Sequence, residues 1–262
     1  MKNHAFDAVL IDMDGVLYHG DQVILPALRF VEALGNRPRA FVTNNPILTP
    51  QSYVDKLARL GFEPPDARFV ITSGLATARH LSMLKPRFRY FAVGAPALHQ
   101  MLSMHGKPVR ENADFVVVGE GKGLDFDSLT QGINLILEGA RLINTNPDTT
   151  VDAVRDGKRI VVPGGGALVA PFVAATGAEP LVIGKPERGL YDMAMDILGV
   201  TPQRCLMIGD RPDTDILGAS RLGMRTALVR TGRFGPGEPW PQEQKRPDWD
   251  VNGLDELMHL LE

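Results

Sequence analysis

Short apolar runs alternate along the chain with segments in which apolar residues recur every three or four positions. The first run, Ala8 to Ile11, is too short for a buried helix and predicts a buried strand. Further strands are expected at 39–42, 69–73, 89–93, 115–118, 141–144, 181–183, 205–208 and 226–229. Helical spacing predicts helices at 25–34, 49–60, 74–84, 95–105, 127–138, 167–176 and 191–198, with others beginning near 216 and 254. Strand followed by helix with short links predicts an α/β fold with a parallel sheet.

The middle of the chain contains its own set of strands and helices. After Lys85-Pro86 the alternation starts afresh, and it continues to the glycine-rich stretch at 163–166 and the helix that follows. We therefore expect one domain formed by residues 1–82 and 180–262, and a second, smaller α/β domain formed by residues 83–179.

Polar residues follow four of the expected strands. They are Asp12 and Asp14, then Thr43 and Asn44, then Lys185, and last Asp210 with Asp213 and Asp215. Ligands of open α/β sheets bind at the carboxyl ends of the strands, so neighbouring strands would bring these groups together. Each group alone also fits a polar turn, an exposed loop lysine or a helix cap. Their shared position at strand ends carries the functional argument.

Together these groups indicate phosphoryl transfer to an aspartate, in which a carboxylate nucleophile divides one difficult displacement into two easier ones. Attack of a carboxylate on an anionic phosphate ester requires charge neutralisation, which Mg²⁺ between Asp12, the Asp14 carbonyl and Asp210 would supply. Asp14 would protonate the leaving oxygen and then deprotonate water. We expect burial near Asp12 to raise its pKa for this role.

The remaining polar groups would position the substrate and the metal. The Thr43 hydroxyl, the Asn44 amide and the Lys185 ammonium would hold the phosphoryl oxygens. Asp213 and Asp215 would orient metal-bound waters without contacting the metal themselves.

Composition excludes several classes of protein. The formal net charge of −3 over 262 residues gives no electrostatic footprint for nucleic acid, and no apolar run reaches the length of a membrane span. The segment Met1 to Phe6 is too short for a signal peptide, so we expect a cytoplasmic protein. Cys205 is the one cysteine, which rules out intrachain disulfides, and its apolar strand predicts a packed core thiol.

Four motifs resemble those of the haloacid dehalogenase (HAD) superfamily. They are Asp12-Met13-Asp14-Gly15-Val16-Leu17-Tyr18, Thr43-Asn44-Asn45, Gly184-Lys185-Pro186 and Gly209-Asp210-Arg211-x-x-Thr214-Asp215-Ile216. The resemblance covers essentially the whole chain, and within the superfamily it is strongest to subclass IIA, the NagD-like and 4-nitrophenylphosphatase-like branch.

The resemblance implies a Rossmann-like core with an inserted α/β cap of type C2, and a Mg²⁺-dependent phosphatase that hydrolyses small-molecule phosphate monoesters through an aspartyl-phosphate. Carried over to this chain, Asp12 is the nucleophile and a metal ligand, and Asp14 is the general acid/base and a carbonyl ligand. Thr43 and Lys185 hold the phosphate, and Asp210 is the other metal ligand.

The substrate is less defined by the resemblance, which allows sugar phosphates, nucleoside monophosphates, phosphoglycolate, glycerol phosphate and pyridoxal phosphate. Residues 144–148 resemble a family loop that reaches the active site from the cap, and Pro46 stands where this branch often has serine. Candidate specificity residues are Arg110, Lys122, Asp125, Asn146 and Asp148. The sequence leaves open whether the protein forms a homodimer or a higher homo-oligomer.

Other functions agree less well with the sequence. A non-catalytic phospho-ligand sensor or partner-binding module on the same fold stays open as the alternative. The glycine clusters at 119–123 and 164–166 do not follow the first strand, which argues against a dinucleotide-binding oxidoreductase. The second aspartate, Asp14, favours phosphate esters over haloacids as substrates.

The late segment Gly232-Arg233-Phe234, with Trp240 and Trp249, is expected to pin a long loop rather than to line the site.

Overall fold

The computed structural model of this chain describes residues 6–155 and 158–261, so the segment Met1–Ala5, used above to argue against a signal peptide, lies outside the described residues. The contacts divide the chain into two units. The core unit comprises Met1–Thr43, Pro50–Ile71 and Lys185–Glu262, and the inserted unit comprises Asn44–Thr49 and Thr72–Gly184. Within residues 6–155 and 158–261, we find no helix with both the length and the apolar character that a membrane crossing requires.

The core unit is built on a sheet with the strand order β15-β14-β13-β1-β4-β5. These strands are β1 (Ala8–Asp12), β4 (Arg39–Thr43), β5 (Val70–Thr72), β13 (Cys205–Gly209), β14 (Arg225–Val229) and β15 (Trp249–Val251). β1 pairs in parallel with both β13 and β4, and all five of its residues are buried. The apolar run at the start of the chain thus forms a central strand, as is typical of parallel sheets covered on both faces.

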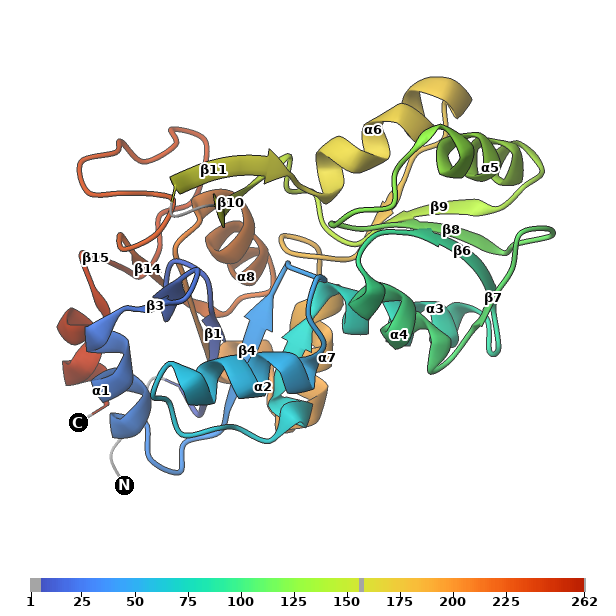
Figure 1. The fold of residues 1–262 in the computed structure, drawn as a ribbon. Helices are drawn as coiled ribbons and strands as arrows, with labels where there is room; N and C mark the ends of the chain where they lie inside the picture. Colours follow the sequence, from blue (N-terminus) through green and yellow to red (C-terminus); the bar gives the residue numbers. More distant parts are fainter. Residues whose placement is uncertain (1–5, 156–157, 262) are drawn as a thin grey trace. The chain divides into compact units, whose positions relative to one another are not determined.

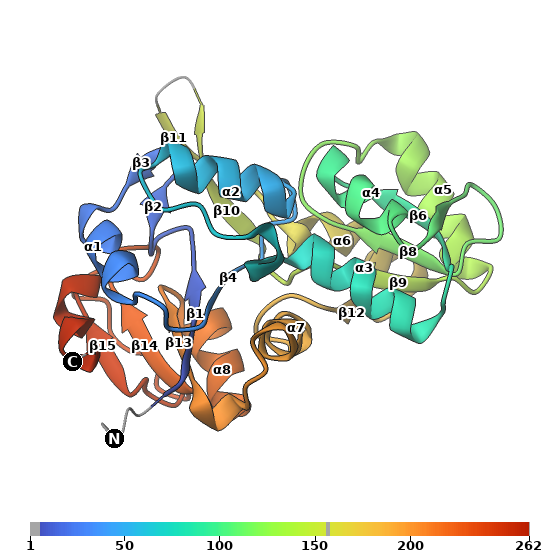
Figure 2. The same ribbon diagram turned by 90° about the horizontal axis from the view of Figure 1, so that it is seen from below.

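Helices flank this sheet on both sides. Figure 2 shows α7 (Gly189–Leu198) and α8 (Leu217–Arg221) on one side of the sheet and α1 (Leu25–Ala33) on the other. The unit also contains α2 (Pro50–Arg59) and the short hairpin of β2 (Tyr18–His19) and β3 (Gln22–Val23). A π-helical turn, Pro212–Ile216, precedes α8, and the closing segment Leu254–Leu260 is a 3-10 helix rather than the expected α-helix.

The inserted unit has a second sheet, with the strand order β12-β9-β8-β6-β7. Its strands are β6 (Arg89–Val93), β7 (Lys107–Pro108), β8 (Phe115–Val118), β9 (Arg141–Asn144) and β12 (Leu181–Val182). In Figure 1, α3 (Ser73–Leu84) and α4 (Pro96–Ser103) cover one face, and α5 (Phe126–Leu137) and α6 (Gly165–Thr176) cover the other. Phe172 of α6 is fully buried in a core with Val116 and Leu135. The chain is therefore α/β, with a Rossmann-like core and an inserted α/β unit.

An antiparallel hairpin of the inserted unit was not expected. β10 (Thr150–Arg155) pairs with β11 (Lys158–Pro163), from Thr150 opposite Pro163 to Arg155 opposite Lys158. The sequence between the strands is Asp156-Gly157, a dipeptide common in hairpins, and these two residues lie outside the described part of the chain. This dipeptide is the signal from which the hairpin could have been predicted.

The sequence predicts that the inserted unit begins at residue 83 and that the core resumes at residue 180. The two units defined by the contacts have other boundaries. α3 packs against α4 and belongs to the inserted unit, as does the short segment Asn44–Thr49 that follows β4. The division therefore separates Thr43 from Asn44 and Gly184 from Lys185, within two of the motifs identified above.

Candidate active site

Three buried aspartates lie together in the core unit. Asp12 is the last residue of β1, and Asp210 directly follows β13, the neighbouring strand in the sheet. Asp215 lies in the π-helical turn that comes next. One carboxylate oxygen from each of the three lies within 4.8 Å of the others, and the side chains are almost inaccessible to solvent. Adjacent parallel strands therefore bring together residues that are about 200 positions apart.

Lys185 is the cation of this aspartate cluster. Its Nζ donates a hydrogen bond of 2.6 Å to Asp12 Oδ1 and forms an ion pair of 2.6 Å with Asp215 Oδ1. The side chain of Lys185 is 3% exposed, which excludes an ordinary exposed loop lysine. A long flexible side chain held by two buried carboxylates keeps its charge at a fixed point in the site.

The electrostatics of the cluster show an excess of negative charge. Burial raises the pKa of Asp12 to about 7, with Asp215 adding to the effect and Lys185 opposing it. Burial, followed by the charges of Asp12 and Asp215, also raises the pKa of Asp210 well above its usual value. Burial alone would lower the pKa of Lys185, but the two carboxylates outweigh it and hold that pKa above its normal value. One ammonium thus faces three carboxylates.

This donor set fits a hard divalent cation. Mg²⁺ prefers oxygen ligands and is commonly held by one or two carboxylates together with waters and substrate phosphate. The oxygens of Asp12, Asp210 and Asp215 are close enough to share one ion, and its charge would offset their mutual repulsion. The residues present therefore fit the group that the sequence motifs imply.

The loop after β14 supports Asp210. This support was not expected from the sequence. The Arg233 backbone N–H donates a hydrogen bond of 2.6 Å to Asp210 Oδ2. A Cβ at Gly15 or Gly232 would lie 2.5 Å or 2.0 Å from the same oxygen, so both positions need glycine. The Thr231 hydroxyl donates to the Gly15 carbonyl at 2.7 Å. The expectation that Gly232-Arg233 only pins a loop is thus wrong, and the glycine itself was the available signal.

Asp215 and Asp213 occupy different environments. The Arg211 N–H donates to Asp215 Oδ2 at 3.1 Å, and a Cβ at Gly209 would lie 2.4 Å from that oxygen. The carboxylate of Asp215 therefore folds back over the end of β13 into the cluster. Asp213 is exposed and pairs with Arg211 at 2.7 Å instead. Both residues were expected to orient metal-bound waters, and the structure brings only Asp215 into the cluster.

Asp14 follows Asp12 on a tight turn. The Gly15 N–H donates to the Tyr18 carbonyl at 2.8 Å, and Gly15 has a φ of +83°, which favours glycine. The Asp14 side chain is exposed. The side chain is therefore not buried as the sequence had led us to expect, but its charge still acts on Asp12 and helps to raise the pKa of that carboxyl.

Thr43 and Asn44 lie at the end of β4, and both are buried. Thr43 belongs to the core unit, whereas Asn44 belongs to the inserted unit. There the Asn44 side-chain amide donates a hydrogen bond of 3.0 Å to Asp148 Oδ2. Asn44 is therefore in contact with the loop at 144–148 that the sequence analysis singled out.

The candidate specificity residues divide by burial. Asn146 and Asp148 are buried, whereas Arg110, Lys122 and Asp125 are exposed. Asp125 caps the N-terminus of α5 by accepting a hydrogen bond of 2.8 Å from the Ser128 N–H. Its carboxylate therefore has a structural role within the inserted unit.

Two further expectations concern the core unit's packing. Trp240 is buried with Ile216 and Leu228, and its ring meets Phe234 edge to face at 5.8 Å. This packing pins the late loop, as expected for Trp240. Cys205 is buried in β13, and burial raises the pKa of its thiol to about 11, so the predicted core thiol is confirmed.

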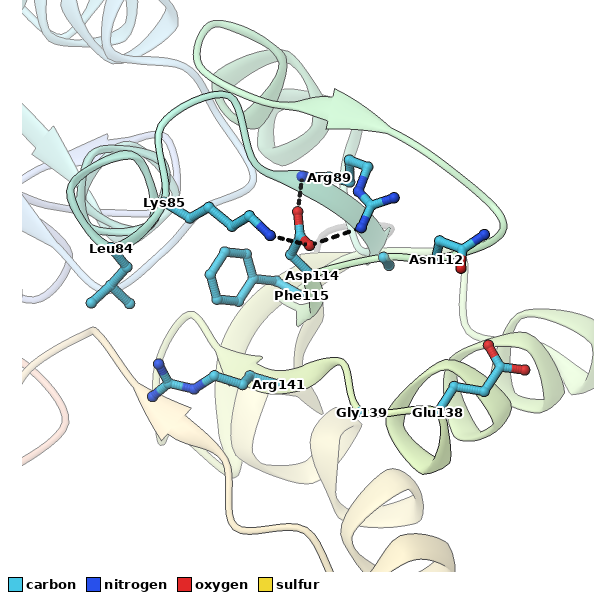
Figure 3. Close-up of a pocket in the computed structure, with 10 residues that line it drawn as sticks. Leu84, Lys85, Arg89, Asn112, Asp114, Phe115, Glu138, Gly139 and Arg141 are labelled. Carbon is cyan, nitrogen blue, oxygen red and sulfur yellow. Dashed lines mark hydrogen bonds and ion pairs between the residues drawn. The ribbon is translucent and has the colours of Figure 1, made fainter.

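A cavity of about 470 Å³ opens in the inserted unit at the amino ends of β6, β8 and β9 (Figure 3). Asp114 accepts hydrogen bonds there from Lys85 Nζ at 2.7 Å and from Arg89 Nη2 at 3.1 Å, and Arg141 lies across the cavity. The loop at 144–148 follows the carboxyl end of β9, at the opposite edge of the same sheet. The cavity is thus remote from the sequence motifs in that unit.

Comparison with known proteins agrees with the motifs. A haloacid dehalogenase-like hydrolase family model matches residues 9–107, and a second, HAD-hydrolase-like model matches residues 182–257. The chain is 35% identical over 259 residues to the 5′-nucleotidase YutF of Bacillus subtilis, covering 98% of this chain and 99% of the relative. It is 33% identical over 266 residues to an acid sugar phosphatase of Staphylococcus haemolyticus, covering 100% and 98%.

A solved structure, that of a 4-nitrophenylphosphatase from Thermotoga maritima, superposes with a TM-score of 0.91 at 33% identity. The match covers 99% of this chain and 98% of that one. The relatives therefore share both units, and not the common core alone. The chain belongs to the haloacid dehalogenase-like hydrolases, in the branch of the 4-nitrophenylphosphatase-like phosphatases.

Proposed function

We propose that this protein is a Mg²⁺-dependent phosphatase that hydrolyses small-molecule phosphate monoesters through an aspartyl-phosphate on Asp12. The observation that carries the proposal is the buried cluster at the end of β1, in which Asp12 lies beside Asp210 and Asp215 and is held by Lys185 at 2.6 Å. A carboxylate at this position has both a fixed orientation and a cation next to it.

The first half of the reaction transfers the phosphoryl group to the protein. A carboxylate oxygen of Asp12 attacks phosphorus, the bond between phosphorus and the ester oxygen breaks, and Asp14 gives its proton to the departing oxygen. Lys185 and the Thr43 hydroxyl stabilise the phosphoryl oxygens. Mg²⁺ held by Asp12, Asp210 and the Asp14 carbonyl, with Asp215 beside them, would neutralise the negative charge of the site.

The second half regenerates the enzyme. Asp14, now ionised, takes a proton from water, and the resulting oxygen attacks phosphorus and displaces the Asp12 carboxylate. Inorganic phosphate leaves and Asp14 is protonated again. An exposed carboxyl suits this role because it must exchange its proton with both an alcohol and water.

The two units take different tasks in this proposal. We assign catalysis to the core, expected at residues 1–82 and 180–262, and substrate selection to a cap within residues 83–179. The similarity to a 5′-nucleotidase and to an acid sugar phosphatase supports nucleoside monophosphates and sugar phosphates as the first substrates to test.

Phosphate release from 4-nitrophenyl phosphate and from a panel of such esters, with Mg²⁺ and with chelator, tests the proposal. Turnover should require metal and fall by at least about 1,000-fold in Asp12→Asn, since removal of a nucleophile typically costs this much or more. Asp7→Asn, an exposed aspartate just before β1, is the matched control and should keep full activity. A fully active Asp12→Asn variant would refute the mechanism. A wild-type protein that binds phosphate but hydrolyses no ester would favour the sensor alternative.

A further inference from the structure

A second cluster of buried polar side chains lies entirely in the inserted unit. It contains Asn44, Ser73, Glu120, Asn146 and Asp148, none of them more than 8% exposed, and we call it the asparagine cluster. Its members come from four separate segments of the sequence. Buried polar groups are costly unless hydrogen-bonded, so such a cluster requires a specific arrangement.

Hydrogen bonds join the cluster around Asn44. Asn146 Nδ2 donates to the Asn44 carbonyl at 2.8 Å and to Glu120 Oε1 at 2.9 Å. The Asp148 N–H donates to Asn146 Oδ1 at 3.1 Å, and Asp148 Oδ2 accepts from Asn44 Nδ2 at 3.0 Å. The Ser73 hydroxyl also donates to the Asn44 carbonyl. Both the backbone carbonyl and the side-chain amide of Asn44 are therefore fixed.

Glycines hold the loop that carries Asn146 and Asp148. A Cβ at Gly164 would lie 2.1 Å from the Asp148 carbonyl oxygen, and one at Gly166 would lie 2.3 Å from that of Pro147. These contacts explain the glycine-rich stretch at the start of α6, to which the proposed mechanism gives no role. The loop is set by backbone contacts, so its side chains have little freedom to move.

We propose that Asp148 and Asn146 are positioning residues for the phosphate site, acting through Asn44. Asn44 directly follows Thr43 in the chain. The hydrogen bonds to the Asn44 backbone carbonyl and side-chain amide hold the backbone after Thr43 in one conformation, and this fixes the position of the Thr43 hydroxyl. A carboxylate acceptor also fixes the plane of the Asn44 amide more firmly than a neutral acceptor would. The inference rests on the proposed function, because it assumes that the Thr43-Asn44 segment binds phosphate.

A double-mutant cycle tests this role. The variants are Asn44→Ala, Asp148→Ala and the double variant, with Asp148→Asn as the conservative change and the exposed Asp127→Ala as control. We expect Asp148→Ala to lower kcat/KM by about 10- to 100-fold, the range for loss of a hydrogen bond to a charged group. Asp148→Asn keeps an acceptor oxygen and should stay within about threefold of wild type, as should the control.

The cycle separates positioning from a purely structural role. If Asp148 acts through Asn44, kcat/KM of the double variant is no lower than that of Asn44→Ala. If the two residues act independently, the fold-losses in kcat/KM multiply. Multiplying effects, a folded Asp148→Ala variant with normal kcat/KM, or an Asp148→Asn variant as impaired as Asp148→Ala would each overturn the proposal. Should Asp148→Ala fail to fold, Asp148→Leu keeps the branched shape and the number of non-hydrogen atoms and removes the acceptor oxygens.

Binding of inorganic phosphate gives a readout that does not need turnover. With Mg²⁺ present, phosphate should raise the unfolding midpoint of the wild type and of Asp148→Asn, and it should raise that of Asp148→Ala much less. An inactive wild-type protein would refute the proposed function, while this measurement would still decide the positioning role. Equal phosphate shifts in all the variants would contradict that role.

Discussion

The aspartate cluster of the core unit and the asparagine cluster of the inserted unit are both buried and both contain carboxylates, but they differ in what those carboxylates contact. In the first, Asp12, Asp210 and Asp215 face a single ammonium, and the pKa values of Asp12 and Asp210 are raised. In the second, amides and a hydroxyl donate to the carboxylates and to the Asn44 carbonyl. Carboxylates that lie beside one another with raised pKa values indicate a site that binds a cation, whereas carboxylates that accept hydrogen bonds from amides indicate a site that holds its own shape.

The largest expected effect comes from removing the ammonium of the aspartate cluster. Lys185→Met leaves Asp12 and Asp215 buried without their cation, and loss of one partner of a buried ion pair costs about 3–5 kcal/mol. Urea unfolding with and without Mg²⁺ measures the loss, which Mg²⁺ should partly restore. Lys85→Met, which removes an exposed lysine paired with Asp114, is the control and should change little. An equal effect of both changes would contradict the charge imbalance described here.

Stabilisation by Mg²⁺ should depend strongly on pH. Asp12 has its pKa raised from 3.8 to about 7 in the folded protein, so the folded state binds protons more tightly than the unfolded state. The metal-free protein therefore loses stability as pH rises from about 4 through 7. Mg²⁺ competes with those protons, and at a hundred times its Kd it should stabilise by about 2.7 kcal/mol at pH 8 but far less at pH 5. Thermal unfolding at both pH values checks this, and a larger shift at pH 5 would contradict it.

A single methyl group should disturb the asparagine cluster. Gly164→Ala places a Cβ against the Asp148 carbonyl while leaving every polar group present, and such overpacking costs about 1–3 kcal/mol. We expect kcat/KM to fall by about tenfold, the lower end of the range expected for Asp148→Ala. Gly235→Ala is the control, because its added methyl meets only the Glu238 side chain at 3.4 Å. Unchanged kinetics in a folded Gly164→Ala variant would show that the loop position is unimportant.

The smallest effect is expected at the cavity in Figure 3. Burial would raise the pKa of Asp114, but hydrogen bonds from Arg89 and Lys85 outweigh it and lower that pKa to about 2. Stability from this carboxylate is therefore complete above its normal pKa of 3.8 and is lost as pH falls toward 2. Asp114→Ala should cost about 1 kcal/mol at pH 7, with a smaller difference at pH 3, because the partners are exposed. Changed phosphatase kinetics would contradict the separation of this cavity from the loop at 144–148, which lies at the opposite edge of the same sheet.

The sequence predicted those features that depend on local pattern. Apolar runs located β1, β4 and β13, and the polar residues that end them include Asp12, Thr43 and Asp210. Parallel pairing then brings strand ends together, which is why residues distant in the sequence could be grouped.

Features that depend on tertiary contacts could not be predicted in this way. Asn44 and Asp148 are 104 positions apart, and nothing in the local pattern joins them. Asp215 enters the aspartate cluster because a π-helical turn folds it back, and Arg233 reaches Asp210 from a long loop. The cytoplasmic location stays a prediction, and the oligomeric state stays open.

The most direct test of the aspartyl-phosphate mechanism uses Asp14→Asn with 4-nitrophenyl phosphate and Mg²⁺. The 4-nitrophenolate anion is a good leaving group that needs no proton, so the first step proceeds, whereas the second step lacks its base. The account predicts a burst of about one equivalent of 4-nitrophenolate, slow turnover afterwards, and phosphate on the acid-quenched peptide that contains Asp12. Three results would contradict it: a burst without phosphate on that peptide, phosphate on another residue, or the same phosphate on that peptide in an Asp12→Asn, Asp14→Asn double variant.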